Sequence, residues 1–354
     1  MKILITGGCG FVGSNLAIYF KDNKIGTQIN SLDNLSRKGT LLNLNRLKEN
    51  KIRNFKIDIS NNKAIKKLPK YDLIVDCCAE AAVETSKKEI DRVFNTNLVG
   101  TFNILKKCVK DKSSLVFLSS SRVYSIKKLL KLKKSNFLIN EKFDTSGAKS
   151  IYGFCKYSSE HLIREFSFLY NIKYIITRFG LISGPWQFGK QDQGFVSRWV
   201  WKHMNKKKFY YIGFGGKGSQ IRDVIHISDV CKLIGLQIKK IRNIHNFTIN
   251  VGGGRKNAIS LQNLTKICQK ITFNRIKIFS KKNTSEYDIP YYVTDNSKVQ
   301  KIYKWKPEKK ILHIVQDMYK WMILNKKVSY AYDYKKYYKI LSHFLFCASF
   351  MFWR

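Results

Sequence analysis

A glycine-rich turn near the N-terminus constrains the fold of this 354-residue chain more than any other feature. A short apolar run, residues 2–6, is followed by Gly8-x-Gly10-x-x-Gly13 and then by residues 14–21, which suit a helix. In a strand–turn–helix unit the first glycine permits the tight turn, the second lets the backbone approach a pyrophosphate, and the third lets helix and strand pack closely. The pattern predicts a dinucleotide-binding unit, with a plain tight turn as the alternative.

The acidic residue Asp33 strengthens this prediction. It ends the next apolar run, twenty residues after Gly13, where a carboxylate accepts hydrogen bonds from the ribose hydroxyls of a dinucleotide. A carboxylate in this position repels a 2′-phosphate, which favours NAD as the cofactor. The nearby Arg37 and Lys38 leave NADP open as the alternative.

Apolar runs of strand length alternate with helical segments through the first half of the chain. This alternation predicts an α/β fold with a Rossmann-type doubly wound parallel sheet. The expected strands lie at 2–6, up to 33, and at 54–59, 71–77, 114–119 and 173–178, and the expected helices at 14–21, 96–109 and 152–169.

The residue composition changes after residue 178, where glycine and aromatic residues become frequent. We interpret this change as a smaller C-terminal substrate-binding lobe that is interleaved with the first domain. We expect an NAD-binding domain over residues 1–177, the lobe over 178–325 with a last helix at 311–324, and a basic, aromatic tail over 326–354.

Composition excludes several classes of protein. With 44% hydrophobic residues the chain is not wholly disordered, and no stretch approaches the about 20 apolar residues of a membrane span. Eight scattered cysteines without a C-x-x-C pair argue against a zinc site and a disulfide framework, so we expect no metal. Together with the lack of a signal peptide, they indicate a reducing, cytoplasmic location.

The net charge is unusual: 66 Lys and Arg face 24 Asp and Glu, which gives +42. One interpretation is a nucleic-acid binder. We favour a general drift of the coding sequence toward lysine, because the lysines are spread along the chain and no nucleic-acid motif accompanies them. For the tail we prefer docking on the body or on a partner subunit, or no role, over contact with a membrane interface.

Tyr152 and Lys156 are four residues apart and therefore share one face of the helix predicted there. An ammonium group and a bound nicotinamide cation would stabilise the phenolate, so that Tyr152 becomes a general base for a sugar hydroxyl. The serines at 119–121 end a predicted strand, and strand ends line the ligand crevice of a parallel sheet. The alternatives are a core tyrosine with a solvated lysine, and a serine-rich turn.

The chain resembles the extended short-chain dehydrogenases/reductases of the NAD-dependent epimerase/dehydratase family over about residues 1–325. The motifs that carry the resemblance are Thr6-Gly-Gly-Cys-Gly-Phe-Val-Gly13, Asp33-Asn-Leu35, Asp58-Ile59, Asn97-Leu-Val-Gly-Thr101, residues 119–124, residues 152–156 and residues 216–226. Residues 184–195, 121–124 and 33–39 are most similar to the CDP-paratose 2-epimerase (CDP-tyvelose epimerase) group.

The resemblance implies roles for individual residues. For catalysis it implies Ser120, Tyr152 as the base and Lys156 as its partner. For NAD it implies Gly7, Gly10, Phe11, Val12, Gly13, Asp33, Asn34, Asp58, Ile59, Ala79, Asn97 and Lys156, and for the substrate Arg122, Gln187, Asp192, Gln193 and Arg222. Arg222 resembles the arginine that approaches the diphosphate, with a structural ion pair to Asp223 as the alternative. Gln187, Asp192 and Gln193 bind the sugar or instead fix a loop.

Three positions depart from the family pattern. Ile151 replaces the usual proline, Ser125 replaces a glycine, and Ser285 stands where an arginine usually precedes the D-x-P sequence. An arginine there would hold a phosphate with two hydrogen bonds, so its absence is expected to weaken substrate binding. Lys281 or Lys282 are candidates to replace it as point charges.

These features lead us to expect C2 epimerisation of a CDP-linked dideoxyhexose, with NAD recycled in the site, by a homodimer. The same residue set supports 4-epimerisation, 4,6-dehydration or reduction. Dehydration is disfavoured because Ser121 and Arg122 stand where a dehydratase typically has an acidic pair. The alternative from a different class is a non-catalytic paralogue that binds a nucleotide sugar or an anionic surface.

Overall fold

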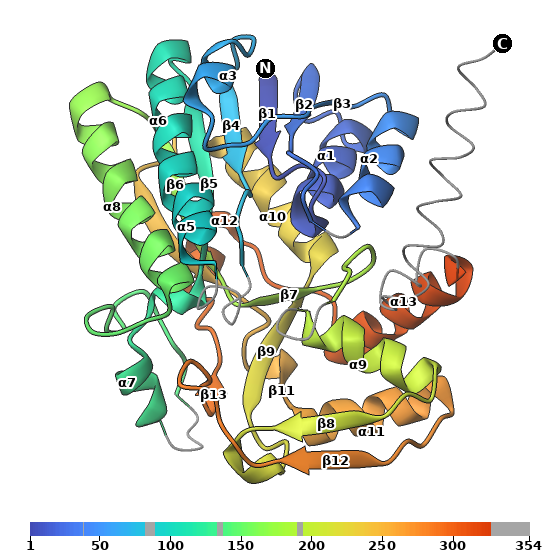
Figure 1. Cartoon of the computed structure of the whole chain (residues 1–354). Helices are drawn as coiled ribbons and strands as arrows, with labels where there is room; N and C mark the ends of the chain where they lie inside the picture. The colour runs from blue at the N-terminus through green and yellow to red at the C-terminus, as the bar shows by residue number, and fades with distance from the viewer. Residues whose placement is uncertain (38, 82–88, 133–136, 190–193, 327–354) are drawn as a thin grey trace, which may run out of the picture.

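The computed structural model describes residues 1–37, 39–81, 89–132, 137–189 and 194–326. Lys38, Asp192, Gln193 and the tail at 327–354 lie outside these residues. Two parts are visible in Figure 1: a large sheet covered by helices, and a smaller lobe with two small sheets.

The large sheet has seven strands in the order β10-β6-β5-β4-β1-β2-β3, and every pairing within it is parallel. The strand order reverses between β1 and β4, which is the point where doubly wound sheets bind their ligands. The predicted fold class is therefore confirmed. The strands are β1 (Lys2–Thr6), β2 (Gln28–Leu32), β3 (Arg53–Phe55), β4 (Leu73–Asp76), β5 (Ser114–Ser120), β6 (Tyr174–Phe179) and β10 (Phe247–Val251).

Two apolar layers hold the helices against this sheet. Successive side chains of a strand point to opposite faces, so Ile3 and Ile5 pack with α1 and α10 while Leu4 packs with α6 and α8. The helices of this part are α1 (Phe11–Asp22), α2 (Thr40–Glu49), α3 (Asn62–Lys66), α5 (Ile90–Phe94), α6 (Gly100–Asp111), α7 (Ile126–Leu130), α8 (Ile151–Tyr170), α10 (Ile227–Lys240) and α12 (Ser297–Tyr303). Shorter helical turns are η1 (Asn95–Val99) and η2 (Ser121–Val123).

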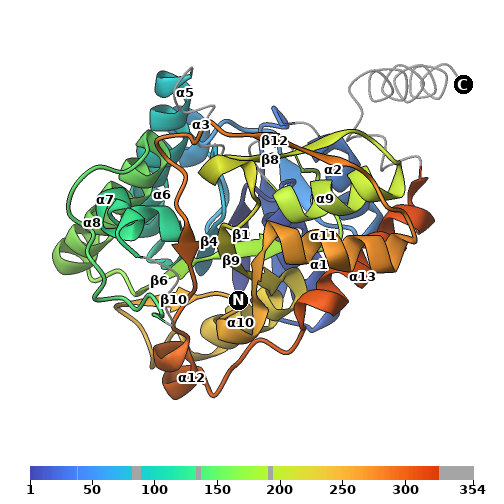
Figure 2. The ribbon, with the colours of Figure 1, turned by 90° about the horizontal axis from the view of Figure 1, so that it is seen from below.

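The smaller lobe lies at the carboxyl ends of the large sheet's strands, as Figures 1 and 2 show. One sheet has the order β11-β9-β13, with β7 also paired to β9, and β8 and β12 form a separate ribbon. Its elements are β7 (Leu181–Ser183), α9 (Phe195–Met204), β8 (Phe209–Ile212), η3 (Phe214–Gly216), β9 (Ile221–His226), η4 (Arg255–Asn257), β11 (Ala258–Ser260), α11 (Leu261–Thr272), β12 (Ile278–Lys281), β13 (Tyr291–Tyr292) and α13 (Ile311–Leu324).

Several predicted boundaries need correction. The strand expected at 54–59 is the short edge strand β3, Arg53–Phe55, because the chain then turns toward the sheet's carboxyl edge with Asp58. The helix expected at 96–109 is part of a longer run from α5 to α6 that contains one π-helical turn, Asn95–Val99. Strand β10 returns from the C-terminal half to the large sheet, and the division at residues 177 and 178 stays a proposal.

The last helix, α13, has the predicted bounds. Among the helices in the described part of the chain, none combines the length and apolar character needed to cross a membrane.

Candidate active site

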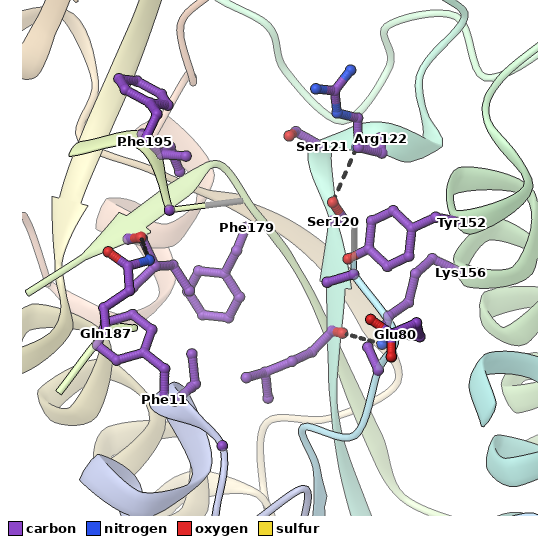
Figure 3. Close-up of a pocket in the computed structure, with 18 of the residues that line it drawn as sticks. Phe11, Glu80, Ser120, Ser121, Arg122, Tyr152, Lys156, Phe179, Gln187 and Phe195 are labelled. Carbon is purple, nitrogen blue, oxygen red and sulfur yellow. Dashed lines mark hydrogen bonds between the residues drawn. The ribbon is translucent and has the colours of Figure 1, made fainter. Parts of the chain in front are cut away.

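A cavity of about 1050 Å³ runs from the carboxyl ends of the large sheet to the smaller lobe. It brings together predicted residues from segments that are far apart in the sequence. Those that line it are Gly7, Gly10, Phe11, Val12, Gly13, Asp33, Asn34, Asp58, Ile59, Ala79, Ser120, Arg122, Tyr152, Lys156, Gln187 and Arg222. Figure 3 shows Ser120, Tyr152 and Lys156 on one wall, with Phe11, Phe179, Gln187 and Phe195 on the other.

The glycine turn forms one end of this cavity. Gly7 has a φ of 61°, in the left-handed region, and its carbonyl accepts a hydrogen bond from Gly10 N at 2.9 Å. A Cβ added to Gly13 would lie 2.3 Å from the Gly7 oxygen, so only glycine permits this approach of α1 to the turn. The N-terminus of α1 thus presents backbone N–H groups to the cavity, and this cradle fits the pyrophosphate of NAD.

Asp33 lies at the end of β2 and faces the same cavity. Cys9 N donates to one carboxylate oxygen at 3.1 Å and Leu35 N to the other at 2.8 Å. Each oxygen keeps a further lone pair for a ribose hydroxyl. Burial raises the pKa of Asp33, whereas these backbone donors and the Arg37 charge act in the opposite direction. The carboxylate is therefore held in place before a ligand arrives.

Asn34 and Asp58 form the neighbouring part of the wall. Asn34 Nδ2 donates to Asp58 Oδ2 at 2.8 Å. Partial burial tends to raise the pKa of Asp58, but hydrogen bonds from Ser60 and Asn34 outweigh it, so the pKa is lowered. This carboxylate can accept hydrogen bonds from the adenine end of a dinucleotide.

Asn97, for which the resemblance implies contact with NAD, is not among the residues that line the cavity and instead supports its wall. Its side chain is fully buried in the π-helical turn, where it accepts from Glu80 N at 2.8 Å and donates to Glu80 O at 3.0 Å. Asn97 thereby holds the segment whose Glu80 side chain lines the cavity. A π-helical turn is often found at functional sites.

Glu80 and two arginines form a charged group that the sequence analysis did not predict. Arg92 Nη2 lies 2.6 Å from Glu80 Oε2, and Arg37 Nε lies 3.9 Å from Glu80 Oε1. All three residues line the cavity near Asp33. The pairing of Arg37 with a buried carboxylate reduces its attraction for a 2′-phosphate, in agreement with NAD.

The helix α8 positions the candidate base. Ser150 caps it, accepting from Gly153 N at 3.1 Å. A Cβ on Gly153 would lie 2.3 Å from the Arg122 carbonyl oxygen, so glycine lets the start of α8 approach the turn that follows Ser120. This close contact brings Tyr152 to the same wall as Ser120, as Figure 3 shows.

Lys156 and Ser120 are held by backbone groups. Lys156 is 2% exposed, donates to Leu118 O at 2.9 Å, and lies 4.4 Å from the centroid of the Phe117 ring. Ser120 accepts from Arg122 N at 3.2 Å and keeps its own hydroxyl hydrogen for another acceptor. A phenol, an ammonium and a hydroxyl therefore converge on the cavity, and such a set can move a proton to and from a sugar hydroxyl.

Arg222 faces the cavity from the strand β9. Its Nη2 donates to Asp288 Oδ1 at 2.8 Å and to Ile289 O at 2.5 Å. Burial lowers the pKa of Arg222 to about 10; Asp288 opposes this effect and the positive charge of Arg122 adds to it. The ion pair considered with Asp223 is wrong, because neighbouring strand residues point to opposite faces.

Asp223 has a structural role that is separate from Arg222. It accepts from Gly254 N at 2.8 Å and from Thr294 N at 3.1 Å, and so joins β9 to two loops. Arg122 Nη1 donates to Tyr287 O at 2.6 Å, and the positive charge of Arg122 acts on Arg222. Both arginines line the cavity, and Arg122 lies on the same wall as Ser120 and Tyr152.

Gln187 lines the cavity but its amide also supports its own loop. Ser183 Oγ donates to Gln187 Oε1 at 2.9 Å, and Gln187 Nε2 donates to Ile182 O at 3.0 Å. The alternative that Gln187 fixes a loop therefore has direct support.

Further cations line the part of the cavity formed by the smaller lobe: Arg198, Lys202, Lys208 and Lys281. Lys281 Nζ lies 4.7 Å from the centroid of the Tyr210 ring. At the position that departs from the family pattern, the Ser285 carbonyl accepts from Asp288 N at 3.0 Å. Of the two lysines considered as replacements for an arginine, Lys281 reaches the cavity.

Comparisons with known proteins agree with this geometry. The NAD dependent epimerase/dehydratase family matches residues 3–252. CDP-paratose 2-epimerase from Salmonella typhi is 29% identical over 91% of this chain and 99% of that protein. A putative UDP-glucose 4-epimerase from Methanocaldococcus jannaschii is 27% identical over 92% of this chain and 99% of that protein.

Solved structures show the same fold. UDP-glucose 4-epimerase from Thermotoga maritima, solved with UDP-glucose, has a TM-score of 0.81 at 24% identity and covers 92% of this chain and 100% of that one. dTDP-glucose 4,6-dehydratase from Bacillus anthracis, solved with NAD, has a TM-score of 0.77 at 23% identity and covers 93% and 98%. The chain belongs to the NAD-dependent epimerase/dehydratase family of nucleotide-sugar enzymes.

Proposed function

We propose that this enzyme epimerises a CDP-linked dideoxyhexose at C2, converting CDP-paratose to CDP-tyvelose. The proposal depends on one observation of geometry: Ser120, Tyr152 and Lys156 share a wall of the cavity that also contains the cradle for NAD. The choice of sugar and position follows the likeness to CDP-paratose 2-epimerase, which extends over 99% of that protein.

The residues of the chain have distinct tasks in this reaction. Tyr152 takes the proton of the C2 hydroxyl, Ser120 holds the same oxygen by a hydrogen bond, and the Lys156 ammonium stabilises the phenolate. NAD, when bound, would supply the hydride acceptor and donor for C2. The 2-keto sugar rotates within the cavity and presents the other face of C2. Tyr152 then returns the proton to the C2 oxygen, so the reaction involves no net oxidation.

The cations of the smaller lobe suit the anionic part of such a substrate. A diphosphate carries charge on several oxygens, and Arg222 and Arg122 both line the cavity. Lys281 adds a charge further along the cavity. We propose that these groups hold the diphosphate while the sugar lies against Tyr152.

Arg222→Gln should raise the substrate KM by about 10- to 100-fold, because hydrogen bonds to charged groups contribute about 1.5–3 kcal/mol. The kcat should change less, since Arg222 acts on the diphosphate and not on the reacting carbon. Steady-state kinetics measures both constants. Arg53→Gln, an exposed arginine on the edge strand β3, is the matched control and should leave KM unchanged. An unchanged KM in Arg222→Gln contradicts the assigned role.

The direct test of the reaction is proton NMR of CDP-paratose with the purified protein and NAD. Appearance of the C2 epimer supports the proposal. If UDP-glucose or dTDP-glucose is converted instead, to a 4-epimer or a 4-keto-6-deoxy sugar, the C2 assignment is wrong and the site belongs to another reaction of the family. If none of the three is converted while NAD stays bound, the proposed substrate class is wrong.

We also propose that the enzyme is a homodimer joined through α6 and α8, which lie side by side on one face of the sheet (Figure 1). Their outer surface carries exposed aromatic side chains, among them Phe102, Phe154 and Phe168, the last of which is 85% exposed. Phe154 and Phe168 are fourteen residues apart, about four helical turns, and therefore share one face of α8. Burial of such a patch is the usual reason for association.

Changing both Phe102 and Phe168 to Asp should convert the dimer to monomers, because burying two carboxylates in an apolar interface is strongly unfavourable. Sedimentation velocity distinguishes one 41.4 kDa chain from two. Phe273→Asp, at a site 91% exposed on the smaller lobe, is the control and should leave the mass unchanged. A wild-type protein that sediments as a monomer contradicts the proposed dimer.

A further inference from the structure

A buried carboxylate, Glu160, connects the strand and the helix that carry the candidate catalytic groups. Glu160 lies on α8 and is 0% exposed. It accepts from Ser119 Oγ at 2.6 Å on one oxygen, and Arg178 donates to both oxygens, at 2.9 Å through Nε and 2.6 Å through Nη2. Arg164 adds a fourth hydrogen bond at 3.2 Å.

The bond from Ser119 has a direct consequence for Ser120. Adjacent residues of a strand direct their side chains to opposite faces, so Ser119 turns toward α8 while Ser120 turns toward the cavity. Tyr152 is on the same helix as Glu160, eight residues earlier. This side-chain hydrogen bond therefore connects the end of β5, with Ser120, to the helix that carries Tyr152, in addition to the bond from Lys156 to Leu118 O.

The same group extends to the strands beside β5. Arg178 on β6 also donates to the Tyr124 hydroxyl at 3.3 Å, and that hydroxyl donates to Asn250 Oδ1 on β10 at 2.7 Å. Loss of part of this pairing would leave a buried charge without a partner and would destabilise the folded protein. The arrangement that keeps all of these hydrogen bonds is therefore favoured over others. The carboxylate thus holds β5, β6 and α8 in fixed relation beneath the cavity.

We propose that Ser119 and Glu160 are positioning residues, whose hydrogen bond fixes the separation of the Ser120 hydroxyl from the Tyr152 phenol. Neither residue needs to touch the substrate for this role. The proposal rests on the proposed function, because it assigns Ser120 and Tyr152 to the same reacting oxygen. An error of about 1 Å in such a pair is enough to reduce turnover by about 100-fold.

Ser119→Ala is the sharpest test, because it removes the bond to Glu160 and leaves both hydrogen bonds between Arg178 and Glu160 and the bond from Lys156 to Leu118 O. We expect kcat to fall by about 10-fold with the substrate KM and the NAD affinity unchanged. Ser119→Thr keeps a hydroxyl and should restore kcat. Ser113→Ala, which removes an equally buried hydroxyl bonded to Tyr71 O at 2.6 Å just before β5, should lose similar stability but no kcat.

Crystal structures of these variants with NAD supply a readout that does not depend on the substrate. In Ser119→Ala the distance between Ser120 Oγ and Tyr152 Oη should change by at least about 0.5 Å, the tolerance within which catalytic groups must be held. An unchanged distance overturns the proposal, and so does an equal fall of kcat in Ser113→Ala. If the wild type converts no nucleotide sugar, the proposed function fails, and the distance still decides whether Ser119 positions Ser120.

Discussion

Replacing Tyr152 with phenylalanine should lower kcat by about 1000-fold, within the range that a positioned acid or base contributes. The substitution removes the phenol that we propose exchanges a proton with the sugar hydroxyl. The ring remains, so its packing with Val93 and Cys155 is kept. The glycine turn and Asp33 are untouched, and NAD should remain bound.

The control for this experiment is Tyr303→Phe. Tyr303 is a buried tyrosine of α12 whose ring packs in the apolar layer between the sheet and its helices, and it is not among the residues that line the cavity. Turnover followed by NMR and NAD content from absorbance of the denatured protein give both readouts. If Tyr152→Phe keeps more than about a tenth of wild-type kcat, another group is the base.

The parts of the site that could be predicted are those encoded by short, fixed spacing. The glycines belong to one turn, Asp33 follows the next strand at a typical spacing, and Tyr152 and Lys156 belong to one helix, so each of these motifs can be recognised from its spacing alone. In the structure all of them line one cavity. Local geometry is readable from a sequence because the backbone imposes its period directly.

The groups that were not predicted come from segments that only the folded chain brings together. Glu80 meets Arg37 and Arg92 across three separate elements, and Glu160 meets Ser119 from 41 residues away. No spacing rule connects such residues. The sequence did contain one signal for Arg222. Because neighbouring side chains of a strand point to opposite faces, Asp223 is a poor partner for Arg222. The partner in the structure is Asp288, from a distant segment.

The fold shows the same division between local and distant information. Strands and helices were found close to their predicted positions because hydrophobic runs and helical periods are local. The return of β10 to the large sheet, next to β6, depends on pairing across 72 residues and has no local signature. The sequence change after residue 178 is the boundary that we propose for the start of the lobe, but it does not show that the chain returns to the large sheet.

Gly13→Ala should weaken NAD binding by about 100-fold, which corresponds to about 2.7 kcal/mol. The new Cβ would lie 2.3 Å from Gly7 O and 2.7 Å from Gly8 Cα, and both contacts are with backbone that cannot rotate away. The turn must therefore shift from α1, and the N–H groups that form the pyrophosphate cradle shift with it. Isothermal titration with NAD measures the loss.

Gly235→Ala separates this effect from a general response to a larger side chain in a helix. Its Cβ would meet only the ends of flexible side chains, at 2.9 Å from Ile25 Cδ1 and 3.3 Å from Tyr19 Cε1. Alanine also favours a helix over glycine by about 1 kcal/mol, which offsets a small rearrangement. We expect wild-type NAD affinity in this control. Affinity within a factor of two of wild type in Gly13→Ala would instead mean that the turn can relax without losing its cradle, and that the close contact of α1 with Gly7 is not what shapes the cofactor site.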